Sequence, residues 1–172
     1  FVNKLNYTLN NKRTINPFVL NIELQHTASM AKISATFNYQ VTLRSKQYFD
    51  IRLFAGAFLA GSYSERSYYA FRASGYNCYQ DYLFESNFLA RNQYRGFGFS
   101  QFADVDGALK AWSPLGQSPE WLAAMNIKTP PIFIFPIKIF ADVAVCDGRA
   151  LNTEAFLWDL GLNIPVVKDV VD

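Results

Sequence analysis

The chain has 172 residues, of which 51% are hydrophobic and 17% aromatic, whereas only 17% are charged. Charged residues are therefore fewer than the ~25% of an average soluble domain. The net charge of +2 and the lack of a Lys/Arg-rich run argue against nucleic acid as a partner. No stretch reaches the ~18 consecutive apolar residues that predict a membrane helix. The composition instead favours a β-rich chain.

A period of two dominates the sequence and predicts amphipathic β-strands throughout. The clearest alternation covers Ile33 to Arg44, where apolar and polar residues alternate without an exception. This stretch exceeds the ~9–11 residues of a transmembrane strand, whereas strands in soluble proteins are mostly ~5–6 residues long. In chain order, the predicted strands are 1–9, 18–25, 33–44, 49–60, 82–91, 103–112, 121–128, 133–145 and 156–164.

The connections between these strands differ in length. Residues 45–47 and 129–131 form short turns, whereas residues 61–81, 92–101 and 113–120 form longer loops rich in aromatic residues, Gly or Pro. Alternating short turns and long loops are typical of outer-membrane β-barrels. The one stretch with the signals of a helix start is Ser118–Met125, because Ser118 is a suitable N-cap and Pro119 suits the first turn.

We therefore predict an all-β fold, an antiparallel up-and-down transmembrane β-barrel segment of roughly eight to nine amphipathic strands. Residues 1–172 would form one partial barrel domain in the bacterial outer membrane. The strand pattern is already under way at Phe1, which leads us to expect a part of a longer polypeptide whose barrel is incomplete on its own. A soluble β-sandwich is the alternative, because its strands alternate in the same way. Long strands, a nearly charge-free apolar face and aromatics near strand ends favour the membrane.

Motifs of metal or nucleophile chemistry do not occur in the sequence. His26 is the single histidine, and Cys78 and Cys146 lie too far apart for metal-ligand spacing. Asp104 and Asp106 fall on the same side of a predicted strand, where we expect a solvated lumen wall and not an acid–base pair. We therefore predict no enzymatic activity, cofactor or metal for this segment.

One ordered set of motifs resembles the bacterial surface-antigen family, the BamA-like outer-membrane assembly factors. A candidate lumen loop at residues 92–101 contains Arg95-Gly96-Phe97, a later strand contains Phe140 and Asp142, and the last strand contains Gly161. The resemblance implies that the Arg95 loop folds into the barrel lumen and that Arg95 pairs there with Asp142. The sequence departs from the family pattern at Tyr94, where Val or Ile is usual, and at Ala144, where Gly is often found.

The resemblance implies a role in inserting or translocating outer-membrane proteins, without covalent chemistry. Implied partners are outer-membrane lipid, the rest of the polypeptide or other subunits, and client outer-membrane proteins. Two alternatives remain open. The barrel could anchor or export a patatin-like or aminopeptidase-like domain in a multidomain protein of the kind found in Bacteroidetes, or it could be a passive porin or transporter.

Overall fold

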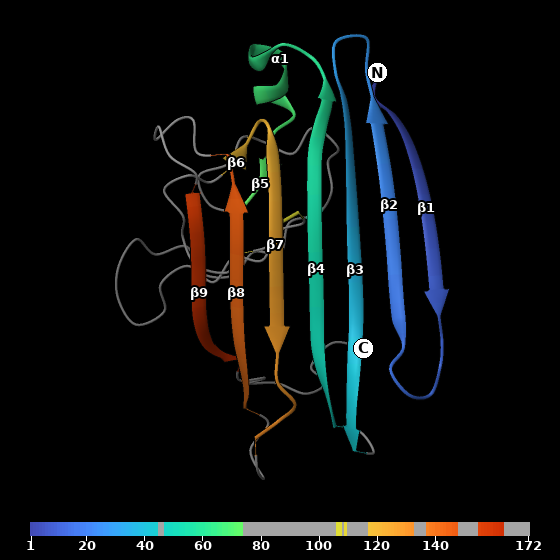
Figure 1. The fold of residues 1–172 in the computed structure, drawn as a ribbon, viewed down its shortest axis with the longest axis vertical. Coiled ribbons are helices and arrows are strands. Elements are labelled where there is room, and N and C mark those ends of the chain that lie inside the picture. The colour runs from blue at the N-terminus through green and yellow to red at the C-terminus, as the bar shows by residue number, and fades with distance from the viewer. Residues whose placement is uncertain are drawn as a thin grey trace, which may run out of the picture.

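Seven antiparallel strands lie side by side in a single sheet with the order β1-β2-β3-β4-β7-β8-β9 (Figure 1). The structure, a computed structural model, describes residues 1–44, 47–73, 106–107, 109, 117–132, 137–147 and 155–163. Each strand of this sheet pairs with the next one along the chain, apart from β4 and β7, between which a separate two-stranded sheet, β5-β6, is inserted. The all-β, antiparallel prediction is confirmed.

The strand bounds follow the alternation in the sequence closely. The strand predicted at residues 33–44 corresponds to β3, which like β4 is 14 residues long. The strands are β1 (Asn3–Asn11), β2 (Phe18–His26), β3 (Ala31–Arg44), β4 (Gln47–Ala60), β5 (Phe71–Arg72), β6 (Gln117–Ser118), β7 (Trp121–Lys128), β8 (Lys138–Cys146) and β9 (Ala155–Asn163).

The register brings apolar residues from each of the seven long strands to one face, which we call the apolar face. Across β3, β4 and β7, for example, Phe37 pairs with Leu53 and Leu53 with Met125. Apart from Arg44, which a register shift at the end of β3 pairs with Gln47, no Asp, Glu, Lys or Arg of the described strands falls on this face. Many of its large side chains are exposed, among them Leu5 (69%), Trp158 (67%) and Leu160 (66%). This sheet therefore presents a broad apolar surface that the chain itself leaves uncovered.

The opposite face, which we call the inner face, has two unlike halves. Near the end of the sheet that carries helix α1 (Tyr63–Tyr68), it holds the hydrophobic core. The ring of Phe71 from β5 packs there against Gly56, where an added Cβ would lie 2.5 Å from Phe71 Cε1. The other members of this core are Phe54, Ala73, Leu109, Leu122, Ala124, Ala144 and Cys146. The inner face is therefore not polar along its whole length, in contrast to a simple lumen wall.

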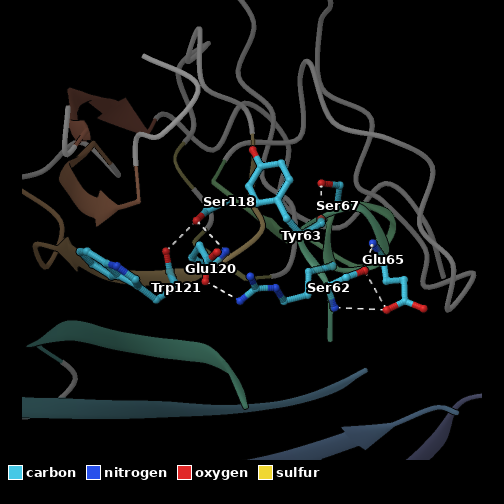
Figure 2. Close-up of polar contacts among 8 residues, drawn as sticks. Ser62, Tyr63, Glu65, Ser67, Ser118, Glu120 and Trp121 are labelled. Carbon is cyan, nitrogen blue, oxygen red and sulfur yellow. Dashed lines mark hydrogen bonds and ion pairs between the residues drawn. The ribbon is translucent and has the colours of Figure 1, made fainter. Parts of the chain in front are cut away.

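Helix α1 follows β4 in a segment where the sequence predicts only a loop. Ser62 and Glu65 form a capping box, in which Glu65 N donates to Ser62 Oγ and Ser62 N donates to Glu65 Oε2 (Figure 2). Arg66 of the same helix forms an ion pair with Glu120, just before β7. The helix that the signals at Ser118 would allow does not form. Ser118 belongs to β6, and its hydroxyl bonds to the Trp121 carbonyl, 2.8 Å away.

Replacing Ser62 with Ala is expected to weaken α1 by about 0.5–2 kcal/mol, because the cap satisfies amides that the helix leaves unpaired. Amide hydrogen exchange of Tyr63–Tyr68 should become faster by the factor that corresponds to this free-energy change. Ser67→Ala is the control, since Ser67 Oγ bonds only back to the Tyr63 carbonyl at 2.9 Å. Equal exchange in the two variants would argue against a stabilising cap.

The predicted strand at residues 103–112 is wrong at its centre. Asp106 and Gly107 form a turn, and Asp106 has a φ of 61°. Asp is one of the few residues that adopt this left-handed conformation readily, and Asp-Gly is a common turn sequence. Leu109 beyond the turn lies in the core, and its amide donates to the Ala73 carbonyl at 2.9 Å.

Candidate functional site

A row of polar side chains crosses the middle of the inner face. In register, Arg52 of β4 pairs with Asn126 of β7, Asn126 with Asp142 of β8, and Asp142 with Asp159 of β9. Residues paired in this way lie on the same side of a sheet, with Cβ atoms ~4.5–5.5 Å apart. Asp142 is 0% exposed and Asp159 8% exposed. The buried carboxylates of this row are expected to lie near a cation, because burying a charge without a partner costs several kcal/mol.

Arg52 is the cation of this row. Its guanidinium donates to Asn126 Oδ1 at 3.0 Å and to the carbonyl oxygen of Asp106. Asp106 in turn accepts a hydrogen bond from the Arg72 amide at 3.0 Å, and its carboxylate lies 3.7 Å from Arg72 Nε. Through Asp106, these contacts link the main sheet to β5. Arg52 therefore contacts both this polar row, through Asn126, and the turn at Asp106.

Phe140 and Gly161, which the sequence places in separate motifs, are direct partners across β8 and β9. The Phe140 ring covers the glycine, since a Cβ added to Gly161 would lie 2.6 Å from Phe140 Cζ. Phe140 is 6% exposed. An aromatic ring over a cross-strand glycine restores the packing that glycine lacks and fixes the register of the two strands. This pairing holds Asp142 and Asp159 opposite each other one step along the strands.

Gly161→Ala is expected to destabilise the protein by about 1–3 kcal/mol, because the new methyl group displaces the Phe140 ring from a packed position. Equilibrium unfolding measures the change. Phe140→Leu in the Gly161→Ala background should recover part of the loss, since the smaller side chain makes room for the methyl group. A double variant no more stable than Gly161→Ala alone would contradict the direct contact.

A buried lysine marks the junction of the main sheet with β5. Lys32 is 5% exposed. Its ammonium group donates to the Tyr69 carbonyl at 3.0 Å and lies 4.7 Å from the centroid of the Phe71 ring. A cation above an aromatic face is attracted by the ring quadrupole, more strongly when water is excluded. Lys32 therefore helps to hold Phe71 against the inner face.

The remaining predicted residues are distributed as follows. Asp142, Phe140 and Gly161 lie together on the inner face. The loop at 92–101 with Arg95, Gly96 and Phe97, and also Cys78 and Asp104, fall outside the described residues. His26 is exposed at the end of β2, and Cys146 is buried in the core.

Among the residues that the structure describes, no group of three or more His, Cys, Asp or Glu side chains could hold a metal ion. None of the described helices has the length and apolar character to cross a membrane.

Comparison of the chain with protein-family models, with curated proteins and with solved structures finds no match.

Proposed function

We propose that this sheet is part of the wall of an outer-membrane β-barrel and that its apolar face contacts lipid. The observation that carries the proposal is the exposed apolar face, which extends over seven strands and, apart from Arg44 at the end of β3, carries no Asp, Glu, Lys or Arg among the described residues. Contiguous apolar patches larger than a few hundred Å² are rare on soluble monomers and mark protein or membrane contacts.

Strand length and aromatic positions support lipid over a protein partner. β3 and β4, at 14 residues each, are longer than the ~9–11 residues that cross a bilayer. On the apolar face, Phe49 lies toward one end of the strands and Trp121 toward the other. Aromatic side chains at both ends are typical of the two membrane interfaces. Phe18, Tyr39 and Phe156 lie two residues along the strands from the row of Leu53, and Phe37 and Trp158 lie in that row.

The edges of the sheet indicate what a complete wall requires. β1 and β9 are the edge strands of the described sheet. Unpaired strand edges are not tolerated in lipid, because their backbone groups have no water to bond. In the proposed barrel, further strands of the same polypeptide or of other subunits pair with these two edges.

Fluorescence of Trp158 tests the lipid contact. In the full polypeptide reconstituted in vesicles, with Trp112 and Trp121 replaced by Phe, we expect lipids brominated on their acyl chains to quench Trp158 strongly. Aqueous iodide should quench it weakly. A polypeptide that stays soluble without detergent and whose Trp158 is quenched by iodide but not by brominated lipid would overturn the proposal.

Within this class, we propose the role of the surface-antigen family, which is insertion or translocation of other outer-membrane proteins. Asp142 is buried on the inner face, as a lumen partner for Arg95 requires, and Phe140 and Gly161 pack together beside it. The hydrophobic core on the inner face also favours this role over a passive pore, because it occupies space that an open channel needs.

A charge swap tests the finer proposal. Arg95→Glu should impair insertion of client proteins into vesicles, because two carboxylates would then face each other. Adding Asp142→Arg should restore part of the activity by reversing the pair. Lys4→Gln is a suitable control, since Lys4 forms an ion pair with Glu23 on a distant strand pair. Full activity in Arg95→Glu would exclude the pairing.

A further inference from the structure

The half of the inner face that the core leaves free contains a cavity of about 710 Å³. It lies toward the end of the sheet opposite α1, where the turn between β1 and β2 closes one side. The volume falls within the ~300–1,000 Å³ of small-molecule sites. This cavity belongs to the face opposite the one proposed to contact lipid, so it does not depend on the membrane assignment.

The turn that forms one wall of the cavity is held firmly against β3. The Gln40 amide donates to the Pro17 carbonyl at 3.1 Å. The Thr42 amide donates to Asn16 Oδ1 at 2.9 Å, and the Asn16 amide donates to Thr42 Oγ1 at 3.3 Å. A wall fixed by three hydrogen bonds is formed before a ligand arrives, which lowers the entropy cost of binding.

The accessible charge in the cavity is positive. Of its two acids, Asp50 accepts a hydrogen bond from Gln40 Nε2 at 2.9 Å and Asp142 is 0% exposed. The cations Lys12, Arg13 and Lys128 line the cavity. Among the described residues, Lys12 and Arg13 form no ion pair with an acidic side chain, whereas Lys128 lies opposite Asp50 in the register of β4 and β7. Three such cations favour an anion, most strongly a phosphate or carboxylate group.

The rest of the lining is suited to hydroxyl groups. Carboxamides can donate and accept hydrogen bonds at once, as a hydroxyl does. Apolar atoms, those of Pro17 and Val19 among them, make up most of the accessible lining, and such a surface can cover the C–H face of a sugar ring. The carboxamides that line the cavity are those of Asn10, Asn11, Asn38, Gln40 and Asn126.

We propose that this cavity binds a small polyhydroxylated anion of the sugar-phosphate class. Arg13 and Lys128 hold the anionic group, and the carboxamides of Asn38 and its neighbours hold the hydroxyls. Arg52, already bonded to Asn126, forms the inner boundary of the site.

Calorimetric titration of the full polypeptide in detergent tests the site with three probes: glucose 6-phosphate, inorganic phosphate and glucose. We expect glucose 6-phosphate to bind most tightly. The double variant Arg13→Gln/Lys128→Gln should weaken its binding about tenfold or more, because two charge-assisted contacts are lost. Asn38→Leu should weaken glucose 6-phosphate but leave inorganic phosphate unchanged.

Lys4→Gln is the matched control, because Lys4 is a cation of the inner face whose partner is Glu23 and which does not line the cavity. It should leave binding unchanged. The proposal is overturned if no phosphate compound binds, if the double variant binds as well as the parent, or if glucose binds as tightly as its phosphate. Equal affinity for inorganic phosphate and glucose 6-phosphate would overturn the assignment of the carboxamides. Retained Trp158 quenching by brominated lipid separates each of these results from a failure of the proposed membrane function.

Discussion

Leu53→Arg is expected to destabilise the folded protein in a lipid bilayer by about 2–4 kcal/mol, which is the cost of an arginine at the bilayer midplane on the lipid face of a barrel. Leu53 lies near the centre of β4, is 41% exposed and pairs with Phe37 and Met125 on the apolar face. No acidic side chain on this face among the described residues could pair with the new charge. Equilibrium unfolding from vesicles measures the loss.

Leu43→Arg provides a control matched in residue type and face. Leu43 is 55% exposed and lies one residue from the end of β3, where an arginine reaches the interface and should cost about 0–1 kcal/mol. On a water-exposed surface, both substitutions would change stability by no more than about 0.5 kcal/mol. Equal, small effects at the two positions would therefore contradict a lipid-facing sheet.

Phe71→Ala is expected to cost about 3–5 kcal/mol, as is usual when a buried phenylalanine is removed. Phe71 is 1% exposed, and its ring contacts Gly56, Lys32 and the rings of Phe54 and Phe58. Its loss removes the main contact that holds β5 on the inner face. Unfolding of the full polypeptide should show the loss, together with faster hydrogen exchange around Arg72. Tyr68→Ala, at a position 76% exposed, should change stability little.

A double-mutant cycle isolates the contact between Phe71 and Gly56. Gly56→Ala alone should be destabilising, since the added methyl group overlaps the ring. In the Phe71→Ala background the same change should cost much less, because the space is then free. Additive effects of the two substitutions would show that they do not share a contact.

The long strands could be predicted because their sequence pattern and their environment agree. β2, β3 and β4 have one face with a uniform character, so a period of two is visible without knowledge of their neighbours. The inserted elements could not be predicted in this way. β5 and β6 have two residues each, which is too short for any period, and both residues of β5 are buried. The Ser62-x-x-Glu65 capping box is the one signal of α1 in the sequence.

Some members of the candidate site could be predicted because each of them is distinctive within its own strand. Asp142 is an isolated acid in an apolar strand, and Gly161 interrupts another. The sequence does not show how neighbouring strands are aligned with one another. The contact of Phe140 with Gly161 and the row from Arg52 to Asp159 depend on how four strands align. A shift of one residue in any of them would send these side chains to the opposite face.

The insertion between β4 and β7 also determines how the sheet can assemble. β1 to β4 are joined by short connections, and so are β7 and β8, whereas β4 ends at Ala60 and β7 begins at Trp121. The entropy lost on closing a loop grows with its length, and contacts distant in sequence form later than local ones. The sheet therefore consists of two groups of strands that form locally, and their joining at β4 and β7 is the slow, non-local step of folding. Arg52 and Phe71 connect β5 to the sheet. Their contacts are expected to favour the pairing of β4 with β7.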